Sequence, residues 1–137
     1  MEIHQSAEDY LECILKLSKT KPVVRSIDIA VEMNYSKPSI SVAMKNLRTN
    51  GYINMDKSGF ITLTDSGRKI AENIYDRHQV LTEGLVLLGV DREVAEQDAC
   101  KVEHNLSAES YDAVKKYIFE VKKEREETAK AAEPAGQ

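Results

Sequence analysis

The chain of 137 residues has no tryptophan, two phenylalanines and only two cysteines. Aromatic residues make up 6% of it, which favours a helical protein packed by aliphatic side chains over a β-sandwich. Cys13 and Cys100 are too few for a disulfide framework, so a reducing cytoplasm is the expected location. The segment Met1-Glu2-Ile3-His4 lacks the basic and apolar regions of a signal peptide. No run approaches the roughly 18 apolar residues of a membrane span.

An excess of positive charge is also missing, because the formal net charge is -4. The charge is unevenly divided along the chain. Residues 1–62 hold eight Lys/Arg and seven Asp/Glu, whereas residues 63–137 hold eleven and sixteen. A near-neutral first part can still bind DNA if its charges are segregated. The acidic second part suits a divalent cation. With 42% hydrophobic and 31% charged residues, a packed core is expected and disorder is not.

Hydrophobic residues recur with a helical period in three segments of the first fifty residues. We expect these helices to begin at Ser6, Ser26 and Ser36, whose hydroxyls are good N-caps. The third helix carries Pro38 in its first turn, where a missing N–H costs nothing. It ends at Asn50-Gly51, since glycine is favoured just after a helix.

The period changes after residue 51. Residues 52–56 and 60–63 are two β-type runs, and Lys57-Ser58-Gly59 between them is a hairpin turn. Three further helices are predicted, the first running from about residue 64 to 88. Asp91 caps the next, to about residue 106, and Ser107 caps the last, to about residue 128. Residues 129–137 are expected to be a flexible tail.

Three short helices followed by a β-hairpin are typical of a winged helix-turn-helix. We therefore predict a mainly α protein, with residues 1–63 as a DNA-binding domain and residues 64–128 as a second, helical domain. Residues 36–50 form the recognition helix, and the hairpin tip is the wing. The candidate DNA-binding residues, all donors to phosphates or base edges, are Ser36, Lys37, Ser39, Ser41, Lys45, Arg48 and Lys57. Helix-turn-helix units also serve as structural or protein-binding modules, and that alternative stays open.

A second constellation lies at Cys100, Glu103 and His104. On a helix these positions are i, i+3 and i+4, so the three side chains share one face. Thiolate, carboxylate and imidazole together form a metal-site composition. A zinc finger is disfavoured, because the chain has no Cys-x-x-Cys pair.

Further potential ligands lie on two other predicted helices. His78 lies on the long helix before this cluster, and Asp9 and Glu12 are one turn apart on the first helix. Each candidate also has a structural alternative. Cys100 fits a buried hydrophobe, Glu103 a surface charge and His78 a hydrogen-bonded core histidine. The acidic pair also suits the start of a helix. The candidate metal ligands are Asp9, Glu12, His78, Cys100, Glu103 and His104.

Five motifs, in order along the chain, resemble the diphtheria toxin repressor family of metal-dependent regulators, in particular its manganese transport regulator branch. The motifs are Ser-Ala-Glu-Asp-Tyr-Leu-Glu (6–12), Leu-Thr-Asp-Ser-Gly-Arg (63–68), Arg-His-Gln-Val-Leu (77–81), Leu-Gly-Val-Asp (88–91) and Asp-Ala-Cys-Lys-Val-Glu-His (98–104). The resemblance runs from about residue 5 to residue 120.

This resemblance implies a homodimer with an N-terminal winged helix and a helical dimerisation domain. It also implies a repressor of metal-uptake genes. In such a repressor, metal joins the first helix to the second domain and positions the two DNA-binding domains of the dimer for a palindromic operator. By position, the six candidate ligands match those of the family. We expect no counterpart of the SH3-like domain of the larger members.

The ligand set is a hybrid of two branches. Asp9 matches the manganese type, where iron-type members carry Met, and its hard oxygen suits Mn(II). Cys100 matches the iron type, where manganese-selective members often have a carboxylate, and it shifts preference towards Fe(II), Co(II) or Zn(II). Position 82 is Thr82, where the iron-type ancillary site needs an acid, so that site is not carried over.

Two alternatives compete with a metal-dependent repressor. One is a winged-helix regulator triggered by an organic ligand or a partner protein. The other is a small metalloenzyme that uses His78, Glu103 and His104. The sequence shows no nucleophile, Gly-rich loop or substrate-pocket signature, so we expect no enzyme.

Overall fold

The computed structural model describes residues 5–132. The chain forms two compact units, Met1–Tyr75 and Asp76–Gln137, and the boundary falls inside one long helix, α4 (Asp65–Leu87). None of the described helices combines the length and the apolar run that crossing a membrane requires. Each unit is built in a different way and holds different candidate residues.

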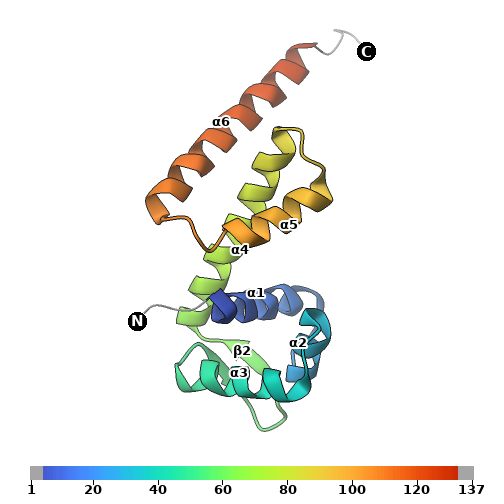
Figure 1. Cartoon of the computed structure of the whole chain (residues 1–137), viewed down its shortest axis with the longest axis vertical. Helices are drawn as coiled ribbons and strands as arrows, with labels where there is room; N and C mark the ends of the chain where they lie inside the picture. Colours follow the sequence, from blue (N-terminus) through green and yellow to red (C-terminus); the bar gives the residue numbers. More distant parts are fainter. Residues whose placement is uncertain (1–4, 133–137) are drawn as a thin grey trace. The chain divides into compact units, whose positions relative to one another are not determined.

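The first unit has the predicted order of three helices and a hairpin (Figure 1). Its elements are α1 (Gln5–Thr20), α2 (Ser26–Met33), α3 (Lys37–Thr49), β1 (Ile53–Met55), β2 (Ile61–Leu63) and the start of α4. The strands pair antiparallel, with Ile53 opposite Leu63. The extended segment before α2 joins the hairpin, because Ile61 N–H donates to the Val24 carbonyl at 2.8 Å. This confirms the mainly helical fold with an N-terminal winged helix-turn-helix.

One apolar cluster holds the first unit together. Leu11 and Ile14 from α1 meet Ile40 and Met44 from α3, and all four are at most 1% exposed. Burying a side chain of this size contributes about 2 kcal/mol each. Because the same helix faces supply this core, α3 turns its polar side outward.

The helix starts are partly as predicted. Ser36 is the N-cap of α3, and its Oγ accepts a hydrogen bond from Ser39 N–H. The predicted caps Ser6 and Ser26 are each wrong, because α1 already begins at Gln5 and α2 includes Ser26. At α2 the cap is Arg25, whose N–H donates to the Asp28 carboxylate at 2.9 Å. That carboxylate fixes the helix start one residue earlier than the serine.

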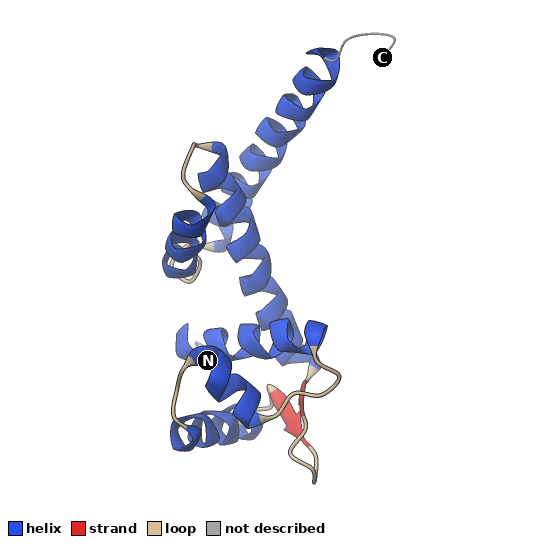
Figure 2. Cartoon of the chain, turned by 90° about the vertical axis from the view of Figure 1, so that its right-hand side faces the viewer, coloured by secondary structure: helices blue, strands red, loops and turns tan. Residues whose placement is uncertain are grey.

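The hairpin tip is organised by Asp56, which sequence patterns did not single out. Its Oδ1 accepts hydrogen bonds from Ser58 N–H and Phe60 N–H, both at 2.9 Å. Gly59 takes a φ of 81°, in the left-handed region that glycine reaches without strain. In Figure 2, where strands are red and loops tan, the tip loop extends beyond the strands. Lys57 in this loop is exposed.

The second unit contains the rest of α4 with α5 (Arg92–Val102) and α6 (Ala108–Ala132). α5 is four residues shorter than predicted, and α6 runs four residues further. Helix α6 passes close to α4 at Gly84. A Cβ added to this glycine would lie only 2.5 Å from Ile118 Cδ1. Of the predicted tail, residues 133–137 lie outside the described residues.

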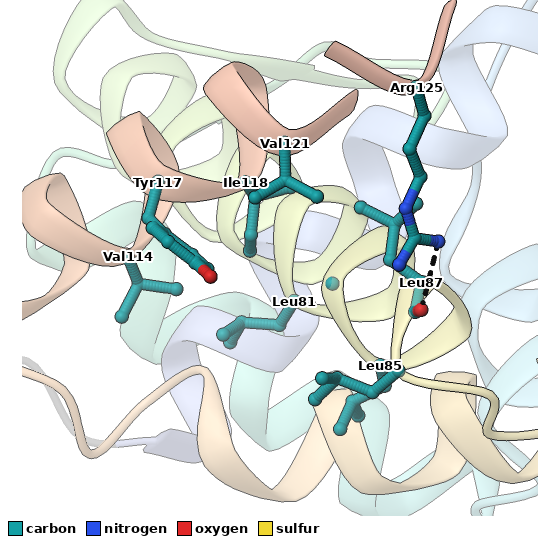
Figure 3. A pocket seen from close by; sticks show the side chains of 10 residues that line it. Leu81, Leu85, Leu87, Val114, Tyr117, Ile118, Val121 and Arg125 are labelled. Atoms are coloured by element: carbon teal, nitrogen blue, oxygen red, sulfur yellow. Dashed lines mark hydrogen bonds between the residues drawn. The ribbon is translucent and has the colours of Figure 1, made fainter. Parts of the chain in front are cut away.

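An apolar groove of about 280 Å³ lies between α4 and α6. Figure 3 shows Leu81 and Leu85 of α4 facing Tyr117, Ile118 and Val121 of α6. At one end, the Arg125 guanidinium donates a 3.1 Å hydrogen bond to the carbonyl of Leu87. Since Leu87 ends α4, this arginine caps the last turn of that helix.

Candidate metal centre and DNA-binding face

A buried carboxylate between two imidazoles is the centre of the second unit. Oε2 of Glu103 lies 2.9 Å from His78 Nδ1, and its Oε1 lies 3.4 Å from His104 Nε2. The side chain of Glu103 is 0% exposed, compared with 18% for His78 and 2% for His104. In the described part of the chain, Oε1 accepts no hydrogen bond. Three predicted ligands, from α4 and from the turn after α5, are therefore brought together.

The turn that carries Glu103 and His104 is held in place by Arg77, the neighbour of His78 on α4. Its guanidinium donates to the Glu103 carbonyl at 3.1 Å and to the Leu106 carbonyl at 2.6 Å. Arg77 is 8% exposed, and its guanidinium lies 4.9 Å from the centre of the Tyr111 ring. These two charge-assisted hydrogen bonds to backbone carbonyls anchor the buried guanidinium and fix the turn.

A polar contact ties α6 to the same part of α4. Tyr111 Oη and Lys115 Nζ both donate to Asp76 Oδ2, the latter at 2.8 Å. Burial raises the pKa of Asp76, but the hydrogen bonds and the Lys115 charge outweigh it and hold that pKa below its usual range. Burial and the bond to Asp76 both raise the pKa of Tyr111. Asp76 thus stays ionised and Tyr111 protonated near neutral pH.

The other candidate ligands belong to α5 and α1. Cys100 is exposed in the last turn of α5, whereas Glu103, one turn later, is buried. Asp9 and Glu12 belong to the first unit and lie one turn apart on α1. Glu12 is 5% exposed, with Oε1 3.8 Å from Lys16 Nζ.

These positions settle two of the structural alternatives. Glu103 is not a surface charge, and Cys100 is not a buried hydrophobe. His78 is hydrogen-bonded, which a structural histidine would also be. A buried carboxylate is costly unless it is compensated, and imidazole with carboxylate is a donor set that transition metals accept. The residues present therefore fit a divalent metal ion.

The candidate DNA-binding residues are all exposed. Six of them lie on α3 or at its N-cap: Ser36, Lys37, Ser39, Ser41, Lys45 and Arg48. Lys57 is exposed at the hairpin tip. The Ser36 hydroxyl donates to Ser39 Oγ at 2.9 Å, and Ile40 N–H donates to the Ser36 carbonyl. Because the cap uses the Ser39 N–H, a phosphate at this end would meet side-chain hydroxyls more than backbone donors.

Sequence patterns missed three residues of these sites. Arg77 acts through contacts with residues far away in the sequence, and Asp56 acts through contacts within one loop. No spacing rule reveals either kind of contact. Val42 has a signal in the sequence, an apolar residue outside the apolar stripe of its helix. It lies among polar residues of α3, off the stripe that contains Ile40 and Met44, and it is 62% exposed.

Two family models match the chain, and together they span most of it. Residues 2–59 match the N-terminal DNA binding domain of iron dependent repressors. Residues 64–129 match the iron dependent repressor metal binding and dimerisation domain. The first match contains the three helices and β1 of the winged helix-turn-helix, and the second contains His78, Cys100, Glu103 and His104.

Named relatives agree with these models. The transcriptional regulator MntR of Escherichia coli O6:H1 is 36% identical over 106 residues, which are 77% of this chain and 68% of that protein. An uncharacterized HTH-type transcriptional regulator of Methanocaldococcus jannaschii is 34% identical over 120 residues, covering 86% of this chain and 96% of that protein.

Solved structures resemble the chain as well. The metal-dependent transcriptional regulator MtsR superposes with a TM-score of 0.76 at 29% identity, over 82% of this chain and 53% of that one. A manganese-dependent transcriptional repressor in complex with manganese gives a TM-score of 0.75 at 27% identity, over 82% and 52%. The chain spans about half the length of these structures.

Proposed function

The chain belongs to the iron dependent repressor family, and on that premise we propose that it is a metal-dependent transcriptional repressor that binds operator DNA as a homodimer. The observation that carries the proposal is the buried Glu103 between His78 and His104, in the region that matches a metal binding and dimerisation domain. The family consists of DNA-binding regulators and not of enzymes. A cytoplasmic location and metal-uptake genes as targets complete the proposal.

The metal ligands in this proposal are the six candidates named from the sequence. His78, Glu103 and His104 supply two imidazoles and a carboxylate, and the exposed Cys100 supplies a thiolate from the adjacent turn of α5. Asp9 and Glu12 complete the set from α1. A divalent cation bound there would offset the negative charge of these carboxylates and stabilise the state in which the donors meet.

The choice of metal depends on Cys100 and Asp9. Carboxylate and imidazole donors accept Mn(II) and Fe(II), and the thiolate adds affinity for softer ions such as Co(II) and Zn(II). The similar structures named above include one manganese-dependent repressor. We therefore assign Mn(II) or Fe(II) as the activating ion, with Co(II) and Zn(II) as competitors.

The DNA-binding element is α3. In a homodimer, two such helices would enter successive major grooves about 34 Å apart, which predicts a palindromic operator. Lys37, Lys45 and Arg48 are placed to contact phosphates or base edges, and Lys57 at the wing to contact a flanking phosphate.

Replacing Lys45 or Arg48 with alanine is expected to weaken operator binding about tenfold each at moderate salt. Each loses a phosphate or base contact, and the slope of log affinity against log salt should fall by about 1 for a lost phosphate contact. Fluorescence anisotropy of a labelled duplex over a salt series measures both quantities. The matched control is Lys123→Ala on the exposed face of α6, which should change neither. Unchanged affinity in both α3 variants would show that this face does not meet DNA.

A further inference from the structure

An exposed valine lies in the middle of the polar face of α3. Val42 is 62% exposed, while Ile40, Met44 and Leu47 on the same helix are at most 4% exposed. At about 100° per residue, Val42 is rotated about 200° from both Ile40 and Met44. It therefore lies nearly opposite the side of α3 that packs into the core.

The neighbours of Val42 on the helix surface are positions three and four residues away. They include Pro38, Ser39 and Lys45, all exposed, and Arg48 lies further along the helix. The apolar side chain thus has a hydroxyl group and an ammonium group among its nearest neighbours on the helix surface. Lys45 and Arg48 complement the charge of a phosphate backbone, which favours DNA as the occupant of this face over an apolar protein partner.

In the major groove, the base edge that takes an apolar contact is the C5-methyl group of thymine. Valine presents two methyl groups and offers no hydrogen bond, so it cannot serve the donor and acceptor atoms of the other edges. Hydrogen bonds to those donor and acceptor atoms would come from Ser41, Lys45 and Arg48. Resting on the DNA-binding function proposed above, we propose that Val42 reads a thymine methyl in each half of the operator and so helps to determine sequence specificity.

A comparison of thymine with deoxyuridine tests this directly, since deoxyuridine lacks only the C5-methyl. A duplex is first selected from a random pool by the wild-type protein with Mn(II). Each thymine is then replaced in turn, in both halves of the site. The wild type should lose about fourfold in affinity per half-site at one thymine position, the factor expected from one buried methyl.

The Val42→Ala variant should bind the thymine duplex as weakly as the wild type binds the matching deoxyuridine duplex, and it should not distinguish the two. Val42→Thr, which keeps one methyl at nearly the same shape, should retain part of the discrimination. Val31→Ala removes an even more exposed valine from α2 (74% exposed) and should behave as wild type. Because Val42 is exposed, none of these changes should alter the melting temperature.

Two results would overturn the inference while leaving the proposed function intact. One is a wild-type protein that binds the selected duplex with metal but is indifferent to every deoxyuridine. The other is a Val42→Ala variant that keeps the full discrimination. Failure of the wild type to select any duplex would overturn the proposed function, and the role of Val42 with it.

Discussion

Replacing Gly67 with alanine is expected to destabilise the protein by about 3 kcal/mol, to lower Tm by about 10 °C and to weaken DNA binding in step. Gly67 lies in the first turn of α4, where a Cβ would overlap the carbonyl oxygen of Tyr52. The helix cannot move aside easily. Thr64 N–H donates to that same carbonyl at 3.0 Å, and Gly67 N–H donates to Thr64 Oγ1 at 3.2 Å.

Thermal unfolding followed by circular dichroism measures this effect. Asn73→Ala, at an exposed position of the same helix, is the matched control and should leave Tm unchanged or raise it slightly. A Gly67→Ala variant with the wild-type midpoint would mean that α4 does not start against Tyr52 as described.

Glu103→Gln is expected to reduce Mn(II) affinity by about a hundredfold or more, since even an outer partner of a metal ligand costs 10–100-fold. Glutamine has the shape of glutamate but not its charge, and His78 lies at 2.9 Å from the carboxylate that changes. Without metal, the variant should be as stable as the wild type or more so. Removing a charge that is 0% exposed removes its desolvation cost.

Titration calorimetry gives the affinity, and the metal-induced shift in stability provides a second readout. At a Mn(II) concentration 100 times the wild-type Kd, the metal should stabilise the wild type by about 2.7 kcal/mol and the variant by about 0.4 kcal/mol. Glu96→Gln, exposed on α5, is the control and should keep the full shift. Equal metal affinity in Glu103→Gln and the wild type would remove Glu103 from the ligand set.

Local sequence patterns predicted most of the fold, because the helices and the hairpin depend on interactions between residues a few positions apart. The stripes of Leu11 and Ile14 in α1 and of Ile40 and Met44 in α3 became the core of the first unit. The helix starts were less predictable. Asp28 reaches back to Arg25 N–H and displaces Ser26 from the cap, a competition that single-residue preferences do not resolve.

The candidate metal centre was predictable in composition but not in detail. The spacing of Glu103 and His104 and their partner His78 were found in the sequence, and the structure brings these three together. The sequence did not predict that α5 ends at Val102. Because it ends there, Glu103 and His104 lie in a turn and not on the helix. Arg77 holds that turn through carbonyls 26 and 29 residues away, and such long-range contacts have no sequence period.

Metal binding and DNA binding are expected to be coupled in this chain. The most direct test is the anisotropy of a labelled, selected duplex, titrated with protein first in chelator and then in saturating Mn(II) or Fe(II) without oxygen. Metal should tighten DNA binding by a factor in the range of about 5–150, and DNA should tighten metal binding by the same factor. The same Kd for DNA with chelator and with each metal would contradict the account.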